Sequence, residues 1–199
     1  MAAAADAAGH ELLVRLAGRL PDELLWRLRD WLAAGAGPVV AGMLPRALLR
    51  GRVGLTREEL DLLGEAVDGW GGPRRLLDAL LPGGPDEREH RFGAGLEPLD
   101  AAALSVLGIV RGHPGCRRLA RAVRLDGDRD QTVVLVRGGD RPWLLTGTLQ
   151  RVLRAHGERT PCVEVLLGEP ATTYHRAALA AATPLWQRDR AARGTPVGV

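Results

Sequence analysis

The chain has 199 residues, of which 46% are hydrophobic and 26% are charged, a balance typical of folded globular proteins rather than disordered ones. All 27 basic residues are arginines, because the chain contains no lysine, and the formal net charge is +3. The missing lysine excludes a phosphate-binding P-loop and Schiff-base catalysis. It also indicates a GC-rich genome, so the arginine content alone is not a nucleic-acid signature.

The beginning of the chain carries neither the basic region nor the long apolar core of a secretory signal. The longest apolar run, AAALSVLGIV, is about half of the ~20 residues that a membrane-spanning helix needs. The two cysteines give no disulfide framework. We therefore expect a soluble cytoplasmic protein that makes no membrane contact.

Residues 1–82 have the pattern of an all-helical module. In PDELLWRLRDWLAAG, leucines and a tryptophan recur at helical spacing, and Pro21 opens the helix. The segment LTREELDLLGEAV contains a capping box, formed by Thr56 and Glu59, above an apolar face. These patterns predict a helical, bundle-like unit.

A second unit is expected over residues 99–199, after a linker at 83–98 that is rich in Gly, Pro and charge. Its first two segments, LDAAALSVLGIVRG and CRRLARAVRL, are predicted as helices, while QTVVLVRG and PCVEVLLG are predicted as strands. One helix is expected before PCVEVLLG and another after it, and TPLWQR is expected to form a short third strand. The predicted fold class is a mixed α+β one, with an all-helical N-terminal half and a small layer of two or three parallel strands.

The charge is divided unevenly between the two units. Residues 1–100 carry 12 arginines and 16 acidic residues, a net of −4, whereas residues 101–199 carry 15 arginines and 8 acidic residues, a net of +7. On the predicted helix, Arg117, Arg118, Arg121 and Arg124 form a basic stripe, which is either a solvated face or a surface that contacts phosphates or an acidic protein. Trp26 lies off the buried stripe of its own helix and is a further candidate for partner contact.

Cys116 lies where the predicted helix begins, next to two arginines and three residues after His113. The dipole of a helix and nearby positive charge both lower the pKa of a thiol, which would make Cys116 an activated thiolate. Alternatively, Cys116 shares an apolar helical face with Leu119 and Val123 and fills the core. The sequence favours the second interpretation.

Ligands of parallel α/β layers bind beyond the carboxyl ends of the strands, here near Gly138-Gly139 and Gly168-Glu169. Glu169 and His175 are therefore candidate ligand contacts, together with Cys116 and His113. The same segment is also typical of an ordinary capped helix start. No serine-hydrolase elbow and no zinc-finger spacing is present, so no catalytic residue, metal or cofactor is expected.

Three classes of function remain. The sequence favours a non-enzymatic interaction, adaptor or regulatory protein that contacts an acidic protein partner within a larger assembly. The second class is a small-ligand-binding protein or an enzyme that uses the α/β layer. The third is a DNA-binding regulator, which the acidic helix at 57–68 and the lack of aromatic residues near the arginine stripe make less attractive. The oligomeric state is not indicated by any pattern.

Overall fold

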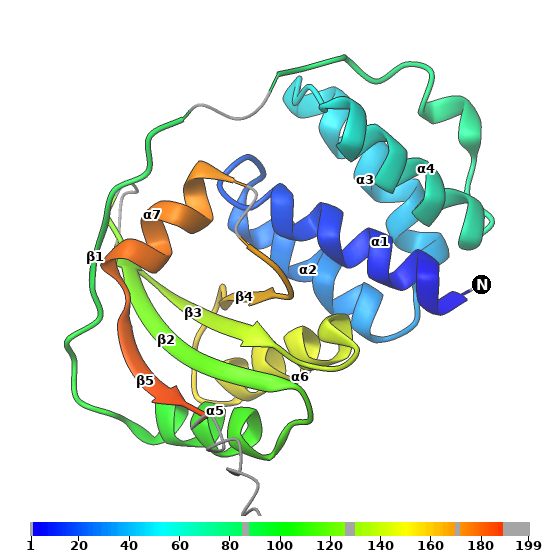
Figure 1. Ribbon diagram of the computed structural model, residues 1–199. Helices are drawn as coiled ribbons and strands as arrows, with labels where there is room; N and C mark the ends of the chain where they lie inside the picture. Colours follow the sequence, from blue (N-terminus) through cyan, green and yellow to red (C-terminus); the bar gives the residue numbers. More distant parts are fainter. Residues whose placement is uncertain (1, 85–87, 126–129, 170–171, 189–199) are drawn as a thin grey trace, which may run out of the picture.

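The computed structural model describes residues 2–84, 88–125, 130–169 and 172–188. It has an α+β architecture in which a helical N-terminal half precedes a mixed five-stranded sheet, as the sequence predicts for the fold class. Figure 1 shows the helical half beside one edge of the sheet, at strand β4 (Cys162–Leu166). In the described part of the chain, no helix is long and apolar enough to cross a membrane.

The helical half consists of four α-helices and one short 3-10 helix. These are α1 (Ala2–Arg15), α2 (Asp22–Ala33), α3 (Gly37–Gly51), α4 (Arg57–Gly69) and η1 (Arg74–Leu76). The predicted capping box is present: Thr56 accepts a hydrogen bond from the Glu59 amide, and Glu59 accepts one from the Thr56 amide. Leucines from all four helices, such as Leu12, Leu44 and Leu63, form one buried core.

Trp70 fixes how these helices pack. Its ring lies where a side chain on Gly9 or Gly37 would have to be, because a Cβ at either glycine would come within 2.3 Å of an indole atom. The indole N–H donates a 2.8 Å hydrogen bond to Asp6. Glycines on two different helices therefore make room for the Trp70 ring. A residue with a side chain at either position would collide with it.

The sheet is built around a long antiparallel hairpin. Its strands are β1 (Phe92–Ala94), β2 (Cys116–Arg124), β3 (Gln131–Gly138), β4 and β5 (Thr183–Gln187). β2 pairs with β3, and its other edge pairs with β1 at one end and β5 at the other. Only β3 and β4 are parallel, and α6 (Pro142–Ala155) provides their crossover connection.

Helices cover both faces of the sheet. α5 (Ala101–Gly112) and α6 lie below the β2–β3 hairpin in Figure 1, and α7 (Thr173–Ala181) lies above it. One face buries Leu119, Val136 and Val163 against α5 and α6, and the other buries Ala122 and Leu135 against α7. Because both faces are covered, the strands carry apolar residues at successive positions and not only at alternate ones.

The prediction of a helix at CRRLARAVRL is wrong, because these residues form strand β2. Arginine and alanine favour helices, and apolar residues at 116, 119, 120 and 123 match a helical face. A strand covered on both faces produces the same run, because side chains on alternate sides are all buried. The sheet consequently has more strands than the predicted two or three, and most of its pairings are antiparallel.

The predicted linker also contributes to the fold. Residues 92–94 form β1 within the sheet, whereas residues 85–87 lie outside the described part of the chain. Buried contacts join the helical half to the sheet, as described below. The division into units 1–82 and 99–199 remains a prediction about independent folding.

Candidate functional site

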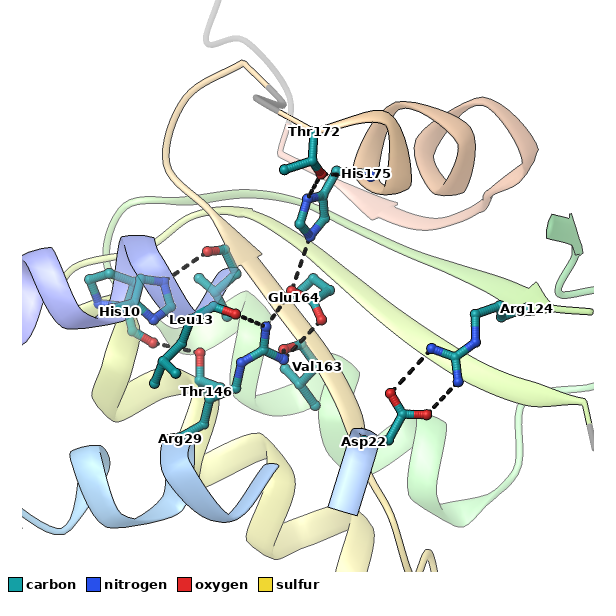
Figure 2. Close-up of polar contacts among 12 residues, drawn as sticks. His10, Leu13, Asp22, Arg29, Arg124, Thr146, Val163, Glu164, Thr172 and His175 are labelled. Carbon is teal, nitrogen blue, oxygen red and sulfur yellow. Dashed lines mark hydrogen bonds and ion pairs between the residues drawn. The ribbon is translucent and has the colours of Figure 1, made fainter. Parts of the chain in front are cut away.

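A buried ion pair joins the helical half to the sheet. Arg29 of α2 donates hydrogen bonds of 2.8 and 2.7 Å to the two carboxylate oxygens of Glu164 on β4, and both side chains are at most 3% exposed (Figure 2). Arg29 also donates to the main-chain oxygens of Val163 and Leu13. Burial alone would raise the pKa of Glu164, but the Arg29 charge and a hydrogen bond from His175 hold that pKa below its usual value.

His175 extends this network into α7. Its Nε2 lies 3.1 Å from Glu164, and its Nδ1 lies 2.7 Å from the hydroxyl of Thr172, which also caps α7 (Figure 2). A hydroxyl, an imidazole and a carboxylate in sequence resemble a catalytic triad. However, both oxygens of Glu164 are bound by Arg29, and the cavity beside Glu164 measures only about 10 Å³. That volume holds no more than a water molecule, so the network is structural.

His10 satisfies the next free carbonyl on the same strand edge. Its Nε2 donates a 3.0 Å hydrogen bond to the main-chain oxygen of Val165, two residues beyond the carbonyl bound by Arg29. Burial lowers the pKa of His10 from 6.5 to about 4, so the ring is neutral at pH 7. Together, His10 and Arg29 cover the outer edge of β4, which would otherwise present unpaired carbonyls.

A second, charged cavity lies beyond the carboxyl ends of β3, β4 and β5. It has a volume of about 900 Å³ and lies on the side of the sheet that α7 covers, with Leu179 of α7 in its wall. Its charged lining residues are Arg117, Arg118, Arg137, Asp140, Glu169 and Arg188. Among the described lining residues, four guanidinium groups and two carboxylates leave an excess of two positive charges.

Two of these arginines oppose each other directly. Arg118 on β2 and Arg137 on β3 are register partners in the antiparallel hairpin, so their side chains leave the same face of the sheet. Directly opposed like charges destabilise a sheet. Arg137 contacts one carboxylate, that of Glu169, at 3.0 Å, whereas the buried Nε of Arg118 has no hydrogen-bond partner among the described residues. The pair therefore concentrates positive charge in the cavity.

Glycines allow the main chain to approach closely at this end of the hairpin. Gly115 and Gly138 have positive φ angles of 76° and 81°, a conformation that other residues rarely adopt. A Cβ on Gly138 would come within 2.3 Å of the Gly115 oxygen. Both glycines line the cavity, and a side chain on Gly138 would force the two turns apart.

Three of the residues selected from the sequence lie in this cavity: Arg117, Arg118 and Glu169. The other two arginines of the expected stripe are engaged elsewhere. β2 directs Arg121 to the face opposite that of Arg118, and Arg124 lies at the far end of the strand from the cavity. Arg121 is 7% exposed and donates to the main-chain oxygens of Gly95 and Glu97. Arg124 forms an ion pair with Asp22 of α2 (Figure 2).

The four candidate ligand residues are not brought together. Cys116 is fully buried, its Sγ lies 3.8 Å from the Nδ1 of His113, and burial raises the pKa of the thiol. The thiol is therefore a core group, as the favoured interpretation of the sequence predicts, and not a thiolate. Glu169 is exposed in the cavity wall, and His175 is buried beside Glu164. Across the described ranges, no cluster of three or more His, Cys, Asp or Glu side chains could hold a metal ion.

Trp26 is half-buried on α2, with the Arg154 guanidinium 4.3 Å from its ring centre and the Arg27 guanidinium at 5.8 Å. The two guanidinium groups make cation–π contacts with the Trp26 ring. Contact of Trp26 with a partner stays a prediction. The only serine, Ser105, lies 3.1 Å from His156 but donates its own proton to the Ala101 oxygen, so the pair lacks the arrangement of an activated nucleophile.

Arg137 and Arg188 are the two arginines of the described cavity lining that the sequence argument missed. Each stands at the end of a predicted strand, and Arg137 directly precedes Gly138-Gly139, part of the predicted ligand-binding edge. An arginine at the carboxyl end of a strand was thus an available signal. Comparison of the chain with protein-family models, with curated proteins and with solved structures finds no match. The functional argument therefore rests on the geometry of the site.

Proposed function

We propose that this protein is a binding module that holds a small anionic ligand in the arginine-lined cavity. The observation that carries the proposal is the direct opposition of Arg118 and Arg137 at a cavity of about 900 Å³. Such a volume is within the range of small-molecule sites, about 300–1,000 Å³. An anion between the two guanidinium groups would remove their mutual repulsion and form charge-assisted hydrogen bonds with both.

The lining chemistry favours binding over catalysis. Among the described residues that line the cavity there is no cysteine, histidine, serine or threonine, and the two carboxylates belong to Asp140 and Glu169. The nearest thiol, on Cys116, is buried with a raised pKa. Arginines can bind and orient an anion, but they do not supply a nucleophile or a general base at neutral pH.

The hypothesis of an adaptor with an acidic protein partner remains open and is compatible with this proposal. An acidic side chain of such a partner is one form of anion that the cavity could accept. DNA binding also remains a prediction, although the arginines line a cavity and two of the expected five contact residues, Arg121 and Arg124, are engaged within the protein. A ligand-binding module is the class that the geometry supports best.

Isothermal titration calorimetry at low salt tests the proposal. The purified protein is titrated with citrate, sulfate and glycerol phosphate, and the same titrations are done with Arg118→Gln and Arg137→Gln. Arg57→Gln on α4 is the matched control, because it removes one positive charge from an exposed position outside the cavity. The proposal predicts saturable binding of at least one anion that both cavity variants weaken and the control retains. Absence of binding by all three anions, or equal binding by all variants, would refute it.

A further inference from the structure

We infer that the ligand is a phosphate monoester bound as the dianion, and that the Glu169 carboxylate occupies part of its place when the cavity is empty. This inference rests on the proposed anion-binding function and specifies the chemical class of the anion. It follows from the charge balance of the cavity, from the spacing of two arginines, and from the weak ion pair that Glu169 makes.

The charge balance points to a dianion. The described residues that line the cavity carry an excess of two positive charges with Glu169 and Asp140 both counted. A phosphate monoester carries between −1.5 and −2 charges near pH 7, because its second pKa is about 6. A monocarboxylate or a single phosphodiester group brings only one negative charge and would leave the cavity partly uncompensated.

The geometry favours a group with three terminal oxygens. Arg118 and Arg137 are opposite each other across one strand pair, a position in which Cβ atoms lie about 4.5–5.5 Å apart. Each guanidinium can donate two parallel hydrogen bonds. A carboxylate has two oxygens and satisfies one such fork, whereas the three oxygens of a phosphate monoester can serve two forks at once.

Glu169 already shows how an anion binds here. Its carboxylate accepts a 3.0 Å hydrogen bond from Arg137, and its side chain is 92% exposed. Exposed ion pairs contribute little to stability, so an incoming phosphate can displace this carboxylate at small cost. Glu169 then acts as an internal competitor that weakens ligand binding and raises selectivity for anions of higher charge.

The remaining lining suits a polar, non-aromatic ligand. Leu167 and Leu179 supply apolar surface, while Gln187 and Asp140 offer hydrogen-bonding groups. In the described part of the cavity wall there is no aromatic ring on which a nucleobase could stack. Glycerol phosphate, a phosphorylated polyol, is therefore the appropriate soluble probe.

The first test is the pH dependence of affinity between pH 5.5 and 7.5, measured by calorimetry for glycerol phosphate and for sulfate. The dianionic fraction of a phosphate monoester rises about fourfold across this range, so its affinity is expected to rise by the same factor. Sulfate stays dianionic and therefore reports pH effects that come from the protein itself, whose nearest ionisable groups are His113 beside Gly139 and the carboxylates of Asp140 and Glu169.

The second test uses Glu169→Gln, with Glu65→Gln as a matched control that removes an exposed carboxylate from α4. Removal of the competitor should raise the affinity for glycerol phosphate by about two- to fivefold, the factor expected for one exposed ion pair. The control should leave the affinity unchanged. Unchanged affinity in Glu169→Gln would contradict the competitor role.

The source of the phosphate is distinguished by vesicles that contain phosphatidic acid, which carries a phosphate monoester headgroup, and by phosphatidylcholine vesicles, which do not. Binding of glycerol phosphate supports a soluble ligand, and binding of phosphatidic acid vesicles alone supports a lipid headgroup. The inference would be overturned if citrate bound as tightly as glycerol phosphate and if the affinity for glycerol phosphate changed with pH no more than that for sulfate. The proposed anion-binding function would remain intact in that case. Binding of double-stranded DNA alone would overturn it in favour of a nucleic-acid partner.

Discussion

Arg29 and Glu164 are 135 positions apart in the chain and form a bidentate ion pair that is almost completely buried (Figure 2). The pair lies where α2 meets the edge strand β4, so it joins the helical half to the sheet. His175 contacts the same carboxylate from α7. Three elements, α2, β4 and α7, therefore depend on one charged group.

Glu164→Gln should destabilise the protein by about 3–5 kcal/mol, because it leaves the Arg29 charge buried without its counter-charge. Urea unfolding followed by circular dichroism measures this loss. The double variant Arg29→Met/Glu164→Met should lose less stability than the single variants Arg29→Met and Glu164→Met lose together. In the double variant neither charge is left buried without its partner. Additive losses would show that the ion pair is not a coupled unit.

The lowered pKa of the buried His10 predicts that the protein loses stability in mild acid. Its pKa is about 4 in the folded protein and about 6.5 when unfolded, so the unfolded state binds more protons between these values. The free energy of unfolding is therefore unaffected above pH 6.5 and falls as the pH decreases from 6.5 to 4, by about 3 kcal/mol at the lower end.

His10→Gln provides the comparison, because its amide can still donate to the Val165 oxygen but does not titrate in this range. Urea unfolding of both proteins at half-unit pH steps gives the difference. The variant should show the shallower decline between pH 6.5 and 4. Equal slopes for the two proteins would mean that His10 does not lose its proton affinity on burial.

Both cysteines should react slowly in the native state. Cys116 is fully buried, Cys162 is 7% exposed, and burial raises the pKa of each thiol. Alkylation by iodoacetamide at pH 8 should be at least about tenfold slower than that of free cysteine and should accelerate in urea. The single variants Cys116→Ala and Cys162→Ala separate the two rates. A native Cys116 that reacts as fast as free cysteine would restore the thiolate interpretation.

Arg118→Gln should stabilise the ligand-free protein. It removes one of two directly opposed positive charges, a change expected to raise the free energy of unfolding by about 0.2–1 kcal/mol at low salt. The gain should shrink in 0.5 M NaCl, because salt screens the repulsion. Arg57→Gln, which breaks an exposed ion pair with Asp61, should produce no gain at either salt concentration. Destabilisation by Arg118→Gln would contradict a charge conflict in the empty cavity.

Much of the fold was predictable, because its signals are local. The capping box at Thr56 and Glu59 marks the start of α4, and the apolar β-branched runs QTVVLVRG and PCVEVLLG mark β3 and β4. The segment TPLWQR was also correctly predicted as a strand. Each of these patterns depends on neighbours within a few residues.

β2 could not be recognised from its own composition, because a strand that is buried on both faces has no alternation to reveal it. Two apolar runs that flank an Asp-Gly pair are typical of a hairpin, and this signal at 126–127 competes with the helical propensity of CRRLARAVRL. The pairing of β2 with β5, 60 or more residues away, has no local signal at all.

The site was partly predictable for a related reason. The rule that ligands bind beyond the ends of parallel strands selects the edge near Gly138 and Glu169, and the charged cavity lies at this edge. The rule cannot identify Arg118 as the partner of Arg137, because that depends on the register of the hairpin. The Arg29–Glu164 pair was also missed, since no pattern relates a charge in α2 to one in β4.

The most direct measurement of the central claim is a nitrogen–proton NMR titration of the labelled protein with glycerol phosphate at pH 7.5. The account predicts saturable shifts for the amides of Gly115, Gly138 and Gly139, which line the cavity, and much weaker shifts in Arg118→Gln at the same concentrations. The helices α1 and α4 should remain unaffected. An unchanged spectrum, or shifts confined to other parts of the chain, would contradict the assignment of this cavity as an anion-binding site.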